Sequence, residues 1–179
     1  MRESPTCPVQ AGTFFGLMAR LVLIALSILM AGGCSNALWI APQIPGGGLN
    51  SQFAEASPAY SSDGRYLAFA SDRNGRRDIF LFDLQQRRLV ALPNLNRWDA
   101  SQDQPSLSAD GRYIAYVSNE RGKSDILVYD RQKQRSELLT ANLGGSVRQP
   151  SISGDGSQVA FETSQLGQWH IAIVKRNVD

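Results

Sequence analysis

The strongest constraint on this chain is a pattern that occurs three times along its 179 residues. Each copy starts with proline, has serine three positions later, and reaches an Asp-Gly pair two positions after that serine. The copies begin at Pro58, Pro105 and Pro150 and align without gaps over roughly 26 residues. Because such self-similarity marks repeated structural units, we expect three similar units, each too small to bury a core alone.

The Asp-Gly pairs predict a tight turn in each copy. Glycine adopts positive φ without strain, and an aspartate side chain accepts hydrogen bonds from nearby backbone amides. Their repetition at one place in every copy favours this structural role over metal binding, because calcium loops alternate several oxygen ligands within about a dozen residues. The turn residues are Asp63, Gly64, Asp110, Gly111, Asp155 and Gly156.

Four strands are expected in each of the first two copies, and the third copy stops where its fourth strand should begin. After the turn comes a segment rich in aromatic and β-branched residues, such as Tyr66–Ser71. A polar loop then leads to a third strand at residues 78–83, and a weaker fourth strand is expected at 88–92 and at 136–140. No helical period follows the leader. The sequence therefore predicts an all-β protein with three blades of four-stranded antiparallel sheet, of the β-propeller type. The blades are expected at about residues 53–97, 98–144 and 145–179.

These units resemble the TolB-like β-propeller repeat over about residues 53–179. The likeness rests on the Pro-x-apolar-Ser-x-Asp-Gly segment, on the apolar strand after it, and on the Asp-Ile pair that opens the third strand. It implies a propeller fold and, by analogy, a scaffold role in the cell envelope. Two features depart from the family. Only three repeats are present where family propellers usually close with six or more, and His170 and Lys175 replace the bracketing aspartates in the third copy.

A leader precedes the repeats. Residues 21–33 form an apolar run behind Arg20 and end in small residues, which is the layout of a secretory signal peptide over residues 1–33. The run is about 13 residues long, shorter than the roughly 20 that span a bilayer. A single-span anchor stays open as an alternative, if residues 14–18 extend the run and the Arg20 side chain reaches the membrane surface.

The leader ends at Cys34, which follows the segment Ala-Gly-Gly. This resembles the lipobox of bacterial lipoproteins, in which small residues precede a cysteine that is lipidated and becomes the mature N-terminus. Cys7, the other cysteine, would leave with the leader, so that Cys34 has no disulfide partner. We therefore expect lipidated Cys34 and a Gly- and Pro-rich tether, residues 34–52, that joins the domain to the membrane. The protein is then expected in the bacterial cell envelope, at the inner or the outer membrane.

Composition argues against several classes of function. Removal of Arg2, Arg20 and Glu3 from 18 basic and 16 acidic residues leaves a net charge of +1, so no nucleic-acid role is expected. His170 is the only histidine and no Gly-x-Ser-x-Gly elbow occurs, so no catalytic residue is predicted. One histidine and Cys34 cannot form a zinc site. We expect no enzyme activity, no metal and no cofactor.

Charged and aromatic residues between the strands have two interpretations. The aspartates that bracket the third strands are expected to cap loops or to accept bonds from backbone amides; they are Asp78, Asp83, Asp125 and Asp130. Basic loops at residues 73–77, 120–123 and 131–135 are interpreted as solvated, with a docking rim for an acidic partner as the second interpretation. Trp98, in the connection between the first two copies, either packs between blades or stays exposed as a partner anchor.

Two functions are compatible with these features. The first is a non-catalytic cell-envelope lipoprotein that acts as a protein-interaction scaffold, with partners among envelope proteins. The alternative is a glycan- or peptide-binding propeller related to hydrolase-associated domains. Three blades also leave two exposed sheet edges, for which three arrangements are open. These are a homodimer that completes a six-bladed ring, addition of residues 37–40 to the third blade as its fourth strand, and an open arc or a fragment of a longer propeller.

Overall fold

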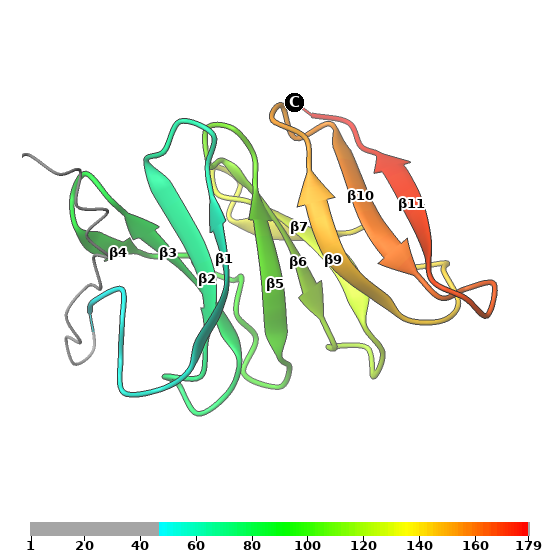
Figure 1. Ribbon diagram of the computed structural model, residues 1–179, viewed down its shortest axis with the longest axis horizontal. Coiled ribbons are helices and arrows are strands. Elements are labelled where there is room, and N and C mark those ends of the chain that lie inside the picture. The colour runs from blue at the N-terminus through cyan, green and yellow to red at the C-terminus, as the bar shows by residue number, and fades with distance from the viewer. Residues whose placement is uncertain (1–46, 179) are drawn as a thin grey trace, which may run out of the picture. The chain divides into compact units, whose positions relative to one another are not determined.

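The computed structural model describes residues 47–178 (Figure 1). The chain divides into two compact units, Met1–Ile40 and Ala41–Asp179, and every described residue belongs to the second. The predicted signal peptide, the lipidation at Cys34 and the added strand at residues 37–40 lie outside the described residues. Between residues 47 and 178 there is no helix that is long and apolar enough to span a membrane.

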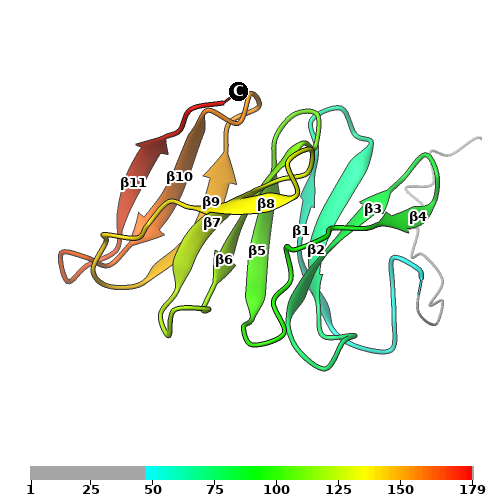
Figure 2. The same ribbon diagram turned by 180° about the vertical axis from the view of Figure 1, so that it is seen from behind.

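The described residues form three antiparallel sheets, which lie side by side in chain order (Figures 1 and 2). Blade 1 contains β1 (Glu55–Tyr60), β2 (Tyr66–Ser71), β3 (Asp78–Asp83) and β4 (Arg88–Val90). Blade 2 contains β5 (Gln102–Leu107), β6 (Tyr113–Ser118), β7 (Asp125–Asp130) and β8 (Arg135–Leu138). Blade 3 contains β9 (Val147–Ile152), β10 (Gln158–Thr163) and β11 (His170–Lys175). The predicted all-β, propeller-type fold is confirmed, and the third sheet has three strands rather than four in the described part of the chain.

In blades 1 and 2 the second and third strands are covered on both faces. All six residues of β2 and of β7 are buried, which explains why these strands are apolar throughout instead of alternating with polar residues. We call the face toward the next blade along the chain the front face and the opposite face the rear face. On β2 the front face carries Ala68 and Ala70, and these small side chains allow the next blade to approach closely.

Two hydrophobic cores lie between the blades. In each, the front face of one blade meets the rear face of the next, and the first strand of the second blade contacts the first three strands of the first. The core between blades 1 and 2 contains Tyr66, Ala68, Ala70, Ile79, Leu81, Leu95, Leu107, Ile114, Tyr116, Leu127 and Tyr129. The core between blades 2 and 3 contains Tyr113, Ala115, Ile126, Val128, Val147, Ile152, Val159 and Phe161. Each blade is therefore stabilised by its neighbours more than by itself.

A bulge recurs in the first strand of every blade. The pairing register shifts between the first and second strands of all three blades. The residue before each repeat proline has positive φ: 52° at Ser57, 53° at Gln104 and 52° at Gln149. Because a bulge bends its strand and increases the local twist, this irregularity is a built-in part of the repeat. The Gln149 amide donates to Gln104 Oε1 at 2.6 Å, so the bulges of blades 2 and 3 are also linked.

Candidate interaction surface

The Asp-Gly turns use their polar groups internally. In the first copy, Asp63 Oδ1 accepts bonds from the Arg65 amide at 2.9 Å and from the Ser61 hydroxyl at 2.5 Å. Ser61 Oγ in turn accepts from the Tyr66 amide at 2.9 Å, which explains the fixed serine of the pattern. The hydroxyl of Ser61, followed by the Arg65 amide, holds the pKa of Asp63 below its usual value. Gly64 has a φ of +70°.

The other two turns repeat this arrangement. Asp110 accepts from the Ser108 hydroxyl and the Arg112 amide, and Asp155 accepts from the Ser153 hydroxyl and the Ser157 amide. Hydrogen bonds from the hydroxyl of Ser153 and from the amide and hydroxyl of Ser157 lower the pKa of Asp155 to about 2. Gly111 and Gly156 have φ values of +68° and +76°. The predicted turn residues thus lie at the tips of hairpins, where their carboxylates are already occupied.

A tyrosine, a glycine and an arginine link each blade to the next; we call this group the interblade clamp. Clamp 1 consists of Tyr66 of blade 1 with Gly111 and Arg131 of blade 2, and clamp 2 consists of Tyr113 of blade 2 with Gly156 and Arg176 of blade 3. The Arg131 guanidinium lies 4.4 Å from the centre of the Tyr66 ring, and Arg176 lies 4.5 Å from that of Tyr113. Stacking of a guanidinium on an aromatic face stabilises by about 0.5–2 kcal/mol.

The same tyrosines are covered from their own blade by a second arginine. Arg65 lies 4.9 Å from the Tyr66 ring, and Arg112 lies 4.7 Å from the Tyr113 ring. Arg112 Nη2 also pairs with Asp130 Oδ2 at 2.9 Å. Burial acts to raise the pKa of Asp130, but bonds from Arg112 and from two backbone amides outweigh burial and hold it below the usual value.

The aspartates around the third strands have protein partners. As expected, Asp83 and Asp130 accept bonds from backbone amides of the loops that follow them. Asp78 and Asp125 are fully buried and are paired with side chains instead: Asn74 donates to Asp78 at 2.8 Å, and the Thr140 hydroxyl donates to Asp125 at 2.8 Å. No cluster of three or more His, Cys, Asp or Glu side chains that could hold a metal occurs among residues 47–178.

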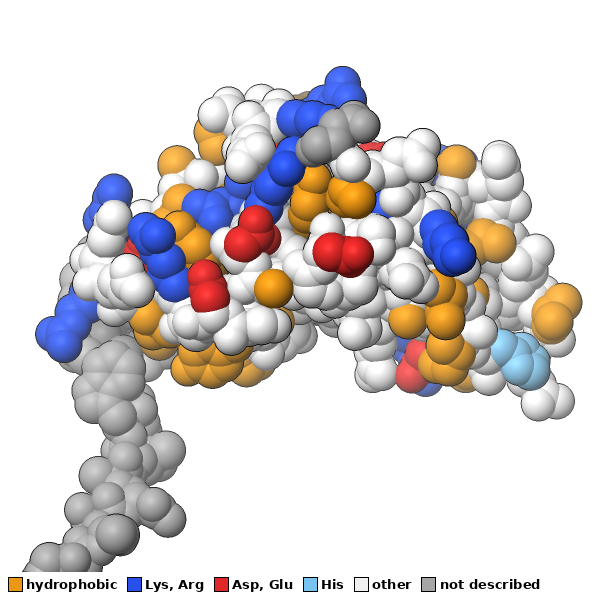
Figure 3. All heavy atoms as spheres, turned by 90° about the horizontal axis from the view of Figure 1, so that it is seen from above, with side chains coloured by type: hydrophobic (Ala, Val, Ile, Leu, Met, Phe, Trp, Pro, Cys, Tyr) orange, Lys and Arg blue, Asp and Glu red, His pale blue; other side chains and the backbone are white. Residues whose placement is uncertain are grey.

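Most basic side chains of the predicted docking rim are engaged within the chain. Arg73 pairs with Glu55 at 3.0 Å and donates to the Gly48 and Leu49 carbonyls at 2.9 Å each. Similar ion pairs join Arg76 to Asp78, Arg77 to Asp72 and Lys123 to Asp125. These ion pairs favour structural roles over a uniformly basic docking rim. Figure 3 views the edge that carries the Asp-Gly turns, opposite to loops 73–77 and 120–123, and there Lys and Arg side chains are also interspersed with Asp and Glu.

Trp98 is the most exposed large apolar side chain of the described residues, with 83% of its surface accessible. It lies in the connection between β4 and β5, next to Arg97. Arg97 pairs with Asp99 at 3.0 Å and with Glu120 of blade 2 at 3.4 Å, which fixes this connection against the neighbouring loop. Of the two interpretations of Trp98, the structure therefore supports exposure rather than packing between blades.

A polar groove of about 420 Å³ adjoins this connection. The Tyr116 hydroxyl, within 2.8 Å of Ser136 Oγ, lies at its base, and burial raises the pKa of Tyr116 to about 12. The groove is lined by Asn94, Leu95, Arg97, Tyr116, Glu120, Leu127, Gln134, Arg135, Ser136 and Leu138. We call this groove together with Trp98 the Trp98 surface. It combines an exposed indole, hydrogen-bonding groups and charges of both signs, which is the composition of a protein-binding site.

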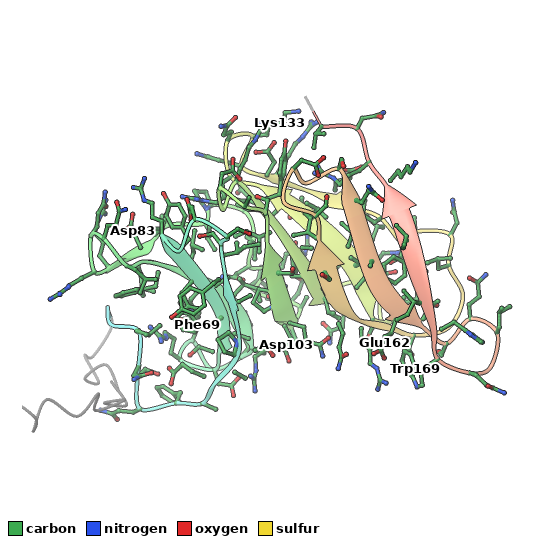
Figure 4. The ribbon with its side chains drawn as sticks, turned by 45° about the horizontal axis from the view of Figure 1, so that its top comes forward. Phe69, Asp83, Asp103, Lys133, Glu162 and Trp169 are labelled. Atoms are coloured by element: carbon green, nitrogen blue, oxygen red, sulfur yellow. The ribbon has the colours of Figure 1, made fainter. Side chains whose placement is uncertain are left out.

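A second exposed aromatic lies on blade 3. Trp169 is 44% exposed, and the Arg148 guanidinium stacks 3.9 Å from its ring centre. Arg148 also pairs with Glu162 at 2.6 Å. Figure 4 shows Glu162 and Trp169 at the edge of the blades opposite to Asp83 and Lys133. His170, the only histidine, is exposed on β11 and pairs through its backbone with Thr163.

Stacked antiparallel sheets with a repeated hairpin turn define a β-propeller protein. The model of the TolB beta propeller domain family matches residues 49–179, and the chain belongs to this family. TolB from Acinetobacter baumannii is a similar structure, with a TM-score of 0.61 and 22% identity over 71% of this chain and 31% of that chain. The putative TolB from Agrobacterium tumefaciens has a TM-score of 0.55 and 19% identity over 71% of this chain and 47% of that chain.

Enzymes share the fold as well. A puromycin hydrolase has a TM-score of 0.54 and 15% identity over 70% of this chain and 19% of that chain. Among the curated proteins, no match was found. The chain spans less than half of the length of each of these structures, and at these identities the likeness concerns the fold.

Proposed function

We propose that this protein is a non-catalytic lipoprotein of the bacterial cell envelope that binds another envelope protein through the Trp98 surface. Membership in the TolB propeller family, the predicted export leader and the predicted lipidation of Cys34 support the envelope location. The carboxylates and most of the basic groups of the repeats are occupied within the blades, whereas the Trp98 surface combines the most exposed large apolar side chain of the described residues with an adjoining groove.

The exposure of Trp98 is the observation that carries the proposal. A tryptophan side chain buries about 150–250 Å² in an interface, and at about 25 cal/mol per Å² burial of its exposed part contributes roughly 3–5 kcal/mol. That is the range of an interface hot spot. Arg97 joins the connection to Glu120 of blade 2 at 3.4 Å, an exposed ion pair that by itself orders the connection only weakly.

Site-specific photocrosslinking in intact cells tests the proposal. A photoreactive amino acid replaces Trp98 in the full chain, and the control carries it at Phe53, which is also exposed (54%) but lies in blade 1 before β1. We expect one exported protein to crosslink from position 98 and not from position 53. The same crosslinked proteins from both positions, or none from position 98, would contradict the proposal.

Lipidation is tested separately. Cells that express the full chain are fed an alkyne fatty acid, and we expect label on the protein that is lost in Cys34→Ser. Unlabelled protein that stays in the membrane fraction would instead support a single-span anchor.

A glycan- or peptide-binding function is the second candidate, because an exposed indole also stacks on sugar rings. It predicts a rise in melting temperature with peptidoglycan fragments or oligosaccharides that is lost in Trp98→Ala. That result, together with no protein crosslinked from position 98, would replace the first proposal with the second.

A further inference from the structure

The front face of blade 3 exposes residues that the other blades bury. Val159 and Phe161 of β10 lie in the core toward blade 2, and their pairing partners on β11 are Val174 and Ala172. Ile171 and Ile173 alternate with these partners along β11 and therefore lie on the opposite, front face. These two isoleucines are 70% and 64% exposed. The equivalent positions are Ile79 and Leu81 in blade 1 and Ile126 and Val128 in blade 2, and all four are at most 1% exposed. In blades 1 and 2 this face is covered by the rear face of the next blade.

The rear face of blade 1 shows the complementary exposure. Tyr60, on β1, is 65% exposed. The equivalent residues are Leu107 of β5 and Ile152 of β9, which are 7% and 8% exposed because the preceding blade covers them. Blade 1 has no preceding blade among the described residues, so its first strand remains uncovered.

On the same rear face, the rings of Phe69 and Phe80 are already covered by Arg73 of blade 1 itself. The Arg73 guanidinium lies 5.2 Å from the Phe69 ring and 4.6 Å from the Phe80 ring, and those rings stack at 5.8 Å. The bonds from Arg73 to the carbonyls of Gly48 and Leu49 hold the segment before β1 beside them. The open part of the rear face is therefore limited to β1 and Tyr60.

We propose that a second copy of this chain covers these surfaces head to tail. The front face of blade 3 of one copy packs on β1 of the other, with Ile171 and Ile173 against Tyr60, and the same contact forms in reverse. This contact reproduces the part of the internal junctions in which the first strand of one blade meets the third strand of the blade before it. Two copies supply six of the described blades, whereas one supplies three and three would supply nine; closed propellers have about four to eight. A closed ring leaves no free face and no growing fibre.

This third junction differs from the two internal ones in its clamp. Gln158 stands where blades 1 and 2 have Tyr66 and Tyr113, and Leu84 stands where blades 2 and 3 have Arg131 and Arg176. Gly64 keeps the space for a tyrosine ring, because nothing lies within 4 Å of an added Cβ. The junction between copies therefore lacks the stacked tyrosine and arginine of the internal clamps and is weaker than the junctions within a chain.

Disulfide crosslinking of the full chain tests the proposal. Two differently tagged chains are produced together, one with Tyr60→Cys and one with Ile173→Cys, and the unmodified chain gives the background from Cys7 and Cys34. We expect a mixed crosslinked dimer of Tyr60→Cys with Ile173→Cys, and no dimer of either variant with itself. Both substituted residues are largely exposed, so folding is preserved. A dimer of Ile173→Cys with itself would overturn the proposal in favour of edge-to-edge pairing of β11, and no mixed dimer above background would overturn it outright.

Completion of the clamp gives an independent test. The double variant Gln158→Tyr with Leu84→Arg restores the ring and the guanidinium on the two sides of the junction between copies. We expect a dissociation constant about tenfold lower than that of the unmodified chain, measured by sedimentation equilibrium in detergent. Each single variant is the matched control and should change it little. Equal dissociation constants for the double variant and the unmodified chain would contradict the head-to-tail geometry. These measurements follow copies of the chain only, so their failure leaves the binding function of the Trp98 surface untouched.

Discussion

The three turn glycines provide an internal test of how the blades are joined. All three have φ near +70°, but their surroundings differ. A Cβ on Gly64 would meet nothing within 4 Å, whereas on Gly156 it would lie 2.3 Å from Cδ2 of Tyr113. The Tyr113 ring cannot easily give way, because it lies between the guanidinium groups of Arg112 and Arg176. Gly64→Ala therefore isolates the cost of the backbone conformation, and Gly156→Ala adds the cost of the clash in clamp 2.

The magnitudes follow from these two contributions. An alanine in the left-handed region costs roughly 1–2 kcal/mol, reduced by the lower entropy of the unfolded chain, so Gly64→Ala should lower the free energy of unfolding by about 1 kcal/mol. Overpacking against a fixed ring costs a further 1–3 kcal/mol or so, so Gly156→Ala should lower it by about 2–4 kcal/mol. Gly111→Ala should fall between the two or near Gly156→Ala, because its Cβ would lie 2.7 Å from the Tyr66 ring.

Urea unfolding of the full chain and the three variants, followed by tryptophan fluorescence, measures these differences. The midpoint should fall least for Gly64→Ala, with an unchanged slope for all variants. Equal losses for Gly64→Ala and Gly156→Ala would refute the claim that the clamp is tightly packed. Loss of cooperativity in Gly156→Ala alone would instead show that blade 3 unfolds separately from blade 2. That result is also expected if clamp 2 joins these two blades.

Three further predictions concern single side chains. Thr140→Val removes the hydroxyl that accepts from the Ile126 amide at 3.0 Å and donates to the buried Asp125. It should lower the free energy of unfolding by about 1–3 kcal/mol. Urea unfolding measures this loss, with Thr140→Ser as the control that keeps a hydroxyl. The pKa of Asp155 is about 2, below its usual value of 3.8. The ionised Asp155 carboxylate therefore stabilises the folded chain above pH 3.8, and this contribution is lost as the pH falls toward 2. The melting temperature of Asp155→Asn should change less between pH 4 and pH 2 than that of the unmodified chain. Arg73→Ala should release the segment before β1, seen as faster limited proteolysis at residues 48–54, whereas Arg73→Lys should restore part of the protection.

The strands could be predicted from the sequence almost residue by residue. Residues 66–71 and 78–83 are strands with the expected bounds, because aromatic and β-branched residues there are bounded by Asp-Gly turns and polar loops that repeat in register. The fourth strands were expected at 88–92 and 136–140 and are shorter, at 88–90 and 135–138. They lie at the outer edge, where few ladder partners and partial burial define their ends less sharply.

The contacts between blades were not predictable from the pattern of one copy. The bulge before each repeat proline places Ser57, Gln104 and Gln149 at positive φ, although serine and glutamine give no local signal for it. The clamps are similar. Tyr113 and Arg176 are 63 positions apart in the sequence, and only the stacking of whole sheets brings them together. A comparison between copies does contain one usable signal. The copies that contain Gly111 and Gly156 each come after a copy with a tyrosine two positions beyond its own turn glycine, Tyr66 and Tyr113 respectively.

The places where the repeat pattern changes are consistent with the proposed junction between copies. On the front face of blade 3, two positions become more polar, since Gln158 replaces a tyrosine and Glu162 replaces Ala70 of blade 1. A third, Lys175, carries the opposite charge to Asp83 of blade 1. Ile171 and Ile173 remain apolar, with 70% and 64% of their surfaces exposed, at the positions that would face Tyr60 of a second copy. The polar surroundings limit the apolar area that the proposed contact between copies would have to cover.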